Sequence, residues 1–193
     1  MTRPPALGSA SGPVPGRALA EVAARRALRR LGLPAEGVEL RREPSGAPRA
    51  YLGPQPLPVH LSLSHAGGRA VAAAAAQRVG VDLLCGPLED AGLWADFFSP
   101  AERSSLSAAC PDALRLGFCV KEAAWKVLAG EGPSEFRDWT VRLRSCSPRG
   151  HARGTVSARA ERGPLCGREA TVRFWSWPSR GDRVALCLLE GAA

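Results

Sequence analysis

The stretch that decides the fold is Val79–Leu84, with the sequence VGVDLL. Its apolar residues predict a short buried strand, and this strand carries one carboxylate, Asp82, close to its end. A carboxylate at the end of an apolar strand can hold a cation. The alternative is that Asp82 only caps a turn, as aspartate commonly does.

A second group of ionisable residues lies in residues 118–126, FCVKEAAWK, which we expect to be helical. With about 3.6 residues per turn, Glu122 and Lys126 stand one above the other, whereas Lys121 points away from them. A Glu–Lys pair at this spacing is also common on solvent-facing helices, where it contributes only about 0.3–0.5 kcal/mol. Only two of the 26 Lys and Arg residues are lysine, however, and both lie here. Their retention favours a functional need for a compact ammonium group.

A third candidate is the segment SLSHAGG, residues 62–68, where an expected strand enters a glycine turn. The hydroxyl of Ser64, the imidazole of His65 and the accessible backbone suit a phosphate group. His65 is equally compatible with a plain surface position at a strand end. Each of the three signals is weak when taken alone.

The remaining pattern predicts an α+β fold. Apolar residues at steps of three and four predict a helix over residues 17–31, and a capping box at Ser99 predicts the start of another. A third helix is expected over residues 111–129, with four buried side chains, Leu114, Phe118, Trp125 and Leu128. Strands are expected over residues 38–43, 59–64, 69–76, 138–144, 154–160, 170–177 and 183–189, and a loop over the proline- and glycine-rich residues 44–58. This order suggests two halves that are joined near residues 86–98.

Composition and charge describe a globular protein with a positive surface. The chain has 193 residues, of which 45% are hydrophobic, and a net charge of +8. This charge favours anionic partners, whether nucleic acid, a phosphorylated cofactor or an acidic protein. Six cysteines without zinc or redox spacing indicate a reducing compartment. Because no signal peptide or membrane-spanning segment is evident, we expect a cytoplasmic protein.

Taken in order, the stretches GRAL (residues 16–19), SLSH (62–65), GVD (80–82) and FCVKEAAWK (118–126) resemble the Sfp-type 4′-phosphopantetheinyl transferases. The resemblance covers about residues 17–143, and its most specific part is the Asp82 motif followed by the Lys–Glu helix. It implies two pseudo-symmetric halves, each a small, mostly antiparallel sheet packed with helix. Residues 1–95 would contain the cofactor-binding helix, the Ser–His strand and the Asp82 strand. Residues 96–193 would contain the Lys–Glu helix and a second sheet.

The same resemblance implies an activity. The family transfers the 4′-phosphopantetheine group of coenzyme A to a serine of a small, acidic acyl or peptidyl carrier protein, usually as a monomer, and releases 3′,5′-ADP. Asp82 and Glu122 would bind Mg²⁺, and Lys126 would neutralise charge that grows on the pyrophosphate. The base would be Glu122 itself or a metal-bound water.

The resemblance also implies contacts to the phosphates of coenzyme A. Ser64 and His65 would contact them, His65 would belong to the catalytic set, and Arg17 would hold an outer phosphate. Arg49 is the candidate substitute for a lysine that some relatives have at the position of Ala47.

Departures from the family pattern leave alternatives open. Leu84 stands where many members have a second acidic residue, so the chain could be a coenzyme A-binding homologue with impaired catalysis. A basic nucleic-acid-binding protein is a third alternative. No binding motif supports it, and tryptophans are grouped with basic residues only around residues 173–177. We therefore expect neither a nucleic-acid nor a membrane partner.

Overall fold

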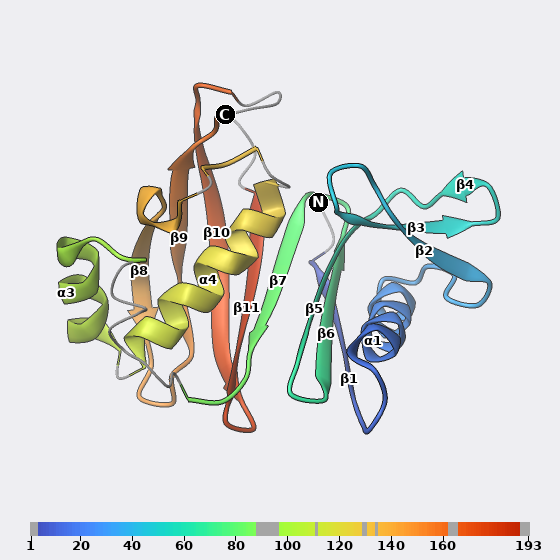
Figure 1. The fold of residues 1–193 in the computed structure, drawn as a ribbon, viewed down its shortest axis with the longest axis horizontal. Coiled ribbons are helices and arrows are strands. Elements are labelled where there is room, and N and C mark those ends of the chain that lie inside the picture. Colours follow the sequence, from blue (N-terminus) through green and yellow to red (C-terminus); the bar gives the residue numbers. More distant parts are fainter. Residues whose placement is uncertain are drawn as a thin grey trace.

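The computed structural model describes residues 4–87, 97–110, 112–128, 131–133, 135–161 and 166–189. Within these residues the chain forms three α-helices and eleven strands, and the strands pair in three antiparallel sheets (Figure 1). This arrangement confirms the expected α+β class. No helix in the described ranges is long and apolar enough to cross a membrane.

The first sheet is built from N-terminal strands and packs against α1 (Gly16–Arg30). Its order is β1-β6-β5, with β1 at Ala6–Ser11, β6 at Arg69–Ala75 and β5 at His60–Ala66. Sequence patterning did not identify β1, because its small residues give little alternation of hydrophobicity. Gly8 of this strand is needed for packing, since a Cβ there would overlap the Ala23 carbonyl oxygen of α1.

A small sheet overturns one expectation. The expectation of a loop over residues 44–58 is wrong, because two strands of a sheet with the order β2-β3-β4 lie there. The bounds are Val38–Arg42 for β2, Pro48–Leu52 for β3 and Gln55–Pro56 for β4. Pro48 and Pro56 stand at strand ends, where a missing N–H group is tolerated. Gly46 adopts a left-handed conformation, with φ at 83°, in the turn between β2 and β3.

The second large sheet has the order β7-β11-β10-β9-β8. Its bounds are Val79–Leu84 for β7, Thr140–Cys146 for β8, Ala152–Arg159 for β9, Glu169–Ser179 for β10 and Asp182–Leu189 for β11. Helix α4 (Ala113–Leu128) lies across one face, and α3 (Pro100–Ala109) lies beside the β8 edge (Figure 1). The predicted cap of α3 is confirmed, since Ser99 Oγ accepts a hydrogen bond from Glu102 N at 3.2 Å.

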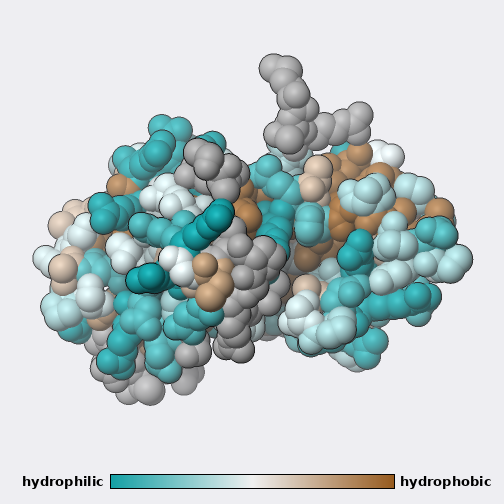
Figure 2. Space-filling view, turned by 90° about the horizontal axis from the view of Figure 1, so that it is seen from above, coloured by the Kyte–Doolittle hydropathy of each residue, from teal (hydrophilic) through white to brown (hydrophobic). Residues whose placement is uncertain are grey.

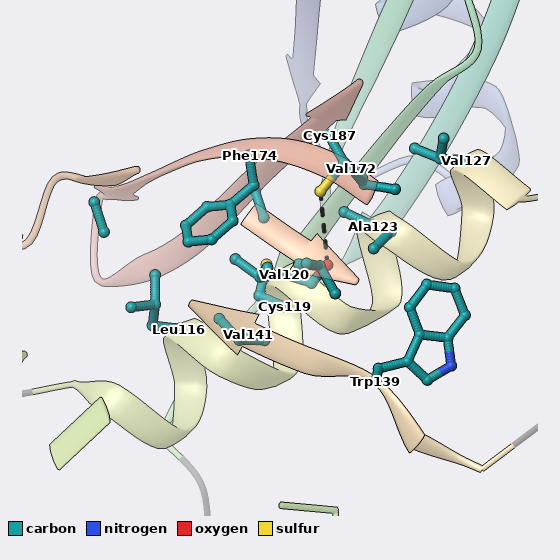
Figure 3. Packing of buried hydrophobic residues seen from close by; sticks show 14 of the residues in the cluster. Leu116, Cys119, Val120, Ala123, Val127, Trp139, Val141, Val172, Phe174 and Cys187 are labelled. Carbon is teal, nitrogen blue, oxygen red and sulfur yellow. Dashed lines mark hydrogen bonds between the residues drawn. The ribbon is translucent and has the colours of Figure 1, made fainter. Parts of the chain in front are cut away.

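Helix α4 packs closely on this sheet through small and medium side chains (Figure 3). A Cβ on Gly80 would overlap the Ala123 carbonyl oxygen, so the glycine allows α4 to approach β7. The expected buried face of the helix is partly wrong, because Trp125 is 41% exposed. The expected helix start at residue 111 lies outside the described residues.

The two large sheets meet along β5 and β7 (Figure 1). Strand β7 pairs with β11, so Asp82 belongs to the second sheet and Ser64 to the first. The expected boundary between residues 95 and 96 lies outside the described residues. On the faces away from the helices, the sheets share an apolar cluster that includes Val71, Val81 and Leu186. Seen from above, hydrophobic surface gathers mainly over the side built on the first sheet (Figure 2).

Candidate functional site

The candidate site is centred on Asp82 of β7, which is only 7% exposed. Its neighbours Val81 and Leu83 point into the apolar cluster shared by the sheets, so Asp82 faces α4. Asp82 Oδ1 accepts hydrogen bonds from Ser64 Oγ at 2.9 Å and from Lys126 Nζ at 2.7 Å. The carboxylate is therefore held by side chains of β5 and α4, which goes beyond the local turn-capping alternative.

Lys126 joins α4 to β7. Besides Asp82 Oδ1, its ammonium contacts the Val81 carbonyl oxygen at 3.2 Å, and its side chain is 23% exposed. The lysine thus makes its ion pair across the helix–strand contact with Asp82. The alternative of a solvent-facing Glu122–Lys126 pair along the helix does not fit, because the Lys126 ammonium contacts β7.

Glu122 lies one helical turn before Lys126 and is half-buried. Burial raises the pKa of its carboxyl group, and the negative charge of Asp82 raises it further, while the charge of Lys126 lowers it. The combined effect is a raised pKa of Glu122. Burial is the largest cause of this shift, and the charges of Asp82 and Lys126 act on the Glu122 carboxyl group in opposite directions.

These oxygen donors fit a divalent cation such as Mg²⁺, which proteins commonly hold with one or two carboxylates together with phosphates and waters. A cation beside Asp82 and Glu122 would oppose the two effects that raise the Glu122 pKa, burial and the charge of Asp82. Leu84, two positions after Asp82, is apolar and packs against the buried residues beneath α4, so this position supplies no ligand. In the part of the chain that the structure describes, no group of three or more His, Cys, Asp or Glu side chains is arranged for a metal.

His65 lies against the first turn of α1, the turn that carries Arg17. The imidazole lies against Gly16, where a Cβ would come within 2.5 Å of His65 Nδ1. Pro15 precedes the helix and provides no side-chain cap, so the first N–H groups of α1 suit an anion. Arg17 is exposed and lies 3.8 Å from Glu21, one turn along the helix. Because His65 follows Ser64, this turn lies close to the strand end that contacts Asp82.

Arg49 lies toward the opposite end of β5. It is exposed on β3 and pairs in register with Arg41. Burial lowers the pKa of His60, and the charges of Arg78 and Arg49 lower it further. Since His60 begins β5 and His65 is near its end, Arg49 stays apart from the Ser64–His65 segment.

Lys121 does not enter this site. Its fully buried ammonium donates to Glu102 Oε2 at 2.8 Å, to the Phe136 carbonyl at 2.9 Å and to the Phe97 carbonyl at 3.0 Å. Glu102 Oε1 in turn accepts a hydrogen bond from Val141 N at 2.7 Å. Sequence reasoning missed Glu102, whose place in the capping box indicated only a helix start. The retention of a second lysine was the available signal, because a buried ammonium needs an acid.

A hollow of about 770 Å³ lies on the face of the second sheet that α4 leaves uncovered. Its lining includes Arg153, Trp175 and Trp177, but not Asp82 or Lys126. The volume of a hollow does not by itself identify a phosphate-binding site, because phosphates can also bind in a shallow, open cleft. The convergence of ionisable groups around Asp82 is the stronger indication of function.

No protein-family model matches the sequence, and a search of curated proteins finds no significant match. The motifs and the geometry around Asp82 therefore carry the functional assignment.

Proposed function

We propose that this chain is a Mg²⁺-dependent 4′-phosphopantetheinyl transferase, which moves the phosphopantetheine arm of coenzyme A onto a serine of an acidic acyl or peptidyl carrier protein. The observation that supports it most directly is the meeting of Asp82, Glu122 and Lys126 at the contact between β7 and α4. Two carboxylates and an ammonium are the groups that a metal-associated pyrophosphate requires.

Topology also supports the proposal. Each large sheet pairs its first strand with its last, β1 with β6 and β7 with β11. In each, a helix packs on the first strand at a glycine, Gly8 beneath α1 and Gly80 beneath α4. Two pseudo-symmetric halves of the transferase type would have this repeated arrangement.

Different residues of the site would bind the metal and the phosphates of coenzyme A. Asp82 and Glu122 would hold Mg²⁺, and the ion, when bound, supplies positive charge that stabilises the reacting pyrophosphate. Lys126 lies beside the same carboxylate and can add its ammonium to that charge. His65, Arg17 and the first turn of α1 would bind the outer phosphates of coenzyme A.

The reaction is a displacement at phosphorus. The carrier serine oxygen bonds to the phosphorus that carries pantetheine, the P–O bond to 3′,5′-ADP breaks, and this nucleotide leaves with the bonding electrons. The proton of the serine hydroxyl would pass to the Glu122 carboxylate or to a water bound at the site. The net charge of +8 favours encounter with an acidic carrier.

Mass spectrometry of an apo carrier domain tests this function. After incubation with the protein, Mg²⁺ and coenzyme A, the carrier is expected to gain one phosphopantetheine group. The gain should disappear with Asp82→Ala and with Glu122→Ala, and should persist with Glu36→Ala, which changes an exposed acid away from the site. Absence of the gain across acyl and peptidyl carriers would reject the transferase assignment.

The second candidate is a coenzyme A-binding protein without transfer activity. It is favoured by one observation, that apolar Leu84 packs into the core where a third ligand would stand. Calorimetry separates the two, because this candidate predicts Mg²⁺-dependent binding of coenzyme A with no mass gain on any carrier.

A further inference from the structure

Strands β5 and β7 belong to different sheets, and two serine hydroxyls join them. Ser62 Oγ accepts a hydrogen bond from Val81 N–H at 2.9 Å, and Ser64 Oγ accepts one from Leu83 N–H at 3.1 Å. Each hydroxyl takes the place of a backbone carbonyl along this side of β7. As links between the sheets, the two contacts are equivalent.

Of the two serines, Ser64 makes an additional bond that involves the site. Its hydroxyl donates to Asp82 Oδ1 at 2.9 Å, and Lys126 donates to the same oxygen. Because a serine hydroxyl has a single proton, donation to Asp82 uses the only one that Ser64 has. Two donors from different elements on Oδ1 restrict the orientation of the carboxylate, and no hydrogen bond from the described residues occupies Oδ2.

We propose that Ser64 is a positioning residue, whose hydroxyl orients the Asp82 carboxylate so that Oδ2 is presented to the metal. This inference rests on the transferase function proposed above. It differs from the role that the family resemblance implies, a direct contact of Ser64 with a phosphate of coenzyme A. A phosphate oxygen would need the same proton that Ser64 donates to Asp82.

The residue after Ser64 extends this role. His65 lies on the other face of β5, against Gly16 in the first turn of α1. Ser64 therefore ties the geometry of Asp82 to the part of the first sheet where phosphate binding is expected. Displacement of this strand end would move the carboxylate with it.

Ser62 provides a matched control, because Ser62→Ala removes the same type of link to β7 and leaves the Asp82 contact intact. The experiment compares Ser62→Ala, Ser64→Ala and Ser64→Thr in the full chain. Binding of Mn²⁺ in the presence of coenzyme A is measured from the electron paramagnetic resonance signal of the free ion. The transfer assay then gives kcat and the KM for coenzyme A, and chemical denaturation gives the unfolding midpoint.

Ser64→Ala is expected to weaken Mn²⁺ binding by about 10- to 100-fold and to lower kcat by a similar factor, as loss of a residue that orients a metal ligand typically does. Ser62→Ala is expected to lower the unfolding midpoint while Mn²⁺ affinity and kcat stay at wild-type values. Ser64→Thr retains a hydroxyl and is expected to recover most of the lost affinity.

Equal losses of Mn²⁺ affinity in both alanine variants would overturn the proposal, because they would indicate a general loosening of the sheet junction. A raised KM for coenzyme A with normal Mn²⁺ affinity in Ser64→Ala would show instead that Ser64 contacts the phosphate. If Ser64→Ala does not fold, Ser64→Cys keeps a similar volume with a weak donor, and wild-type Mn²⁺ affinity there would also overturn it. A wild-type protein that neither binds Mn²⁺ with coenzyme A nor transfers the arm would refute the transferase function itself.

Discussion

Lys126 Nζ lies 2.7 Å from Asp82 Oδ1, which makes an ion pair between the last turn of α4 and strand β7. The dipole of the helix also favours a cation in its last turn. In the resting protein the pair ties the helix to the strand. Under the proposed function, the same ammonium would neutralise charge on the pyrophosphate of coenzyme A.

Substitution of Lys126 should therefore reduce the rate of transfer. Lys126→Ala is expected to lower kcat by about 10²- to 10³-fold, the loss typical of removing one group that stabilises charge in the transition state. Lys126→Arg should recover only part of it, because a planar guanidinium cannot replace the compact ammonium that contacts both Asp82 and the Val81 carbonyl. Steady-state kinetics at saturating coenzyme A measures both variants. Wild-type kcat in Lys126→Arg would show that charge alone is required.

The other lysine should control stability. Lys121→Met leaves Glu102 buried without its ammonium partner, and breaking a buried pair in this way costs about 3–5 kcal/mol of unfolding free energy. The double variant Lys121→Met/Glu102→Gln should be more stable than Lys121→Met, because the glutamine oxygen can still accept the bond from Val141 N–H. Chemical denaturation of both variants measures the difference. A double variant that is no more stable than the single one contradicts this interpretation of the pair.

Elements with a clear local signal could be predicted from sequence, and elements defined by pairing could not. The expected strand Val79–Leu84 coincides with β7, and the Ser99 cap marks the start of α3. By contrast, β1 and β3 escaped prediction. Their small and proline-containing residues show little alternation, and pairing with β6 and β2 is what defines them as strands.

Helix α4 shows the limit of periodicity. Trp125 was expected to be buried because it is large and apolar, yet it is 41% exposed. The buried stripe of the helix contains the small residues Ala123 and Ala124, because the close approach at Gly80 leaves no room for an indole there. A prediction from hydrophobicity alone therefore placed Trp125 on the wrong side of the helix.

For the site, motifs identified Asp82, Glu122 and Lys126 one by one. They could not show that Ser64 and Lys126 share one oxygen of Asp82, because these bonds join residues 18 and 44 positions apart and depend on how the sheets and helix pack. The link from Ser62 to β7 could not be predicted for the same reason.

The contact between β7 and α4 predicts that Gly80→Ala will disturb stability and the site together. The added methyl would overlap the Ala123 carbonyl oxygen, so α4 must move away from β7, and such overpacking costs about 1–3 kcal/mol or more. Gly8→Ala creates the equivalent overlap between β1 and α1 and serves as a control. Both variants should lower the unfolding midpoint, but only Gly80→Ala should weaken Mn²⁺ binding measured without coenzyme A, because α1 is assigned to the cofactor and not to the metal. Normal Mn²⁺ affinity in Gly80→Ala would mean that this contact does not set the distance between Asp82 and Glu122.

Glu122 predicts a pH dependence of stability in the metal-free protein. Burial and the charge of Asp82 raise its pKa above the ordinary value of 4.5, so between 4.5 and the raised value the folded state binds more protons than the unfolded state. The free energy of unfolding should therefore fall as pH rises through this window and then stay at the lower level. Glu122→Gln removes this contribution.

We accordingly expect Glu122→Gln and the wild type to have the same stability below pH 4.5, with the variant becoming more stable than the wild type as pH rises toward 7. Urea denaturation at a series of pH values, without divalent metal, measures the difference. Glu36 is a control for which the opposite result is expected. Its hydrogen bond to Arg29 lowers its pKa, so Glu36→Gln should become less stable than the wild type as pH rises. A constant difference between Glu122→Gln and the wild type at all pH values would mean that Asp82 and burial do not act on this carboxyl as described. Added Mg²⁺ with coenzyme A should reverse the order at neutral pH, because a bound cation favours the charged carboxylate and the glutamine variant lacks it.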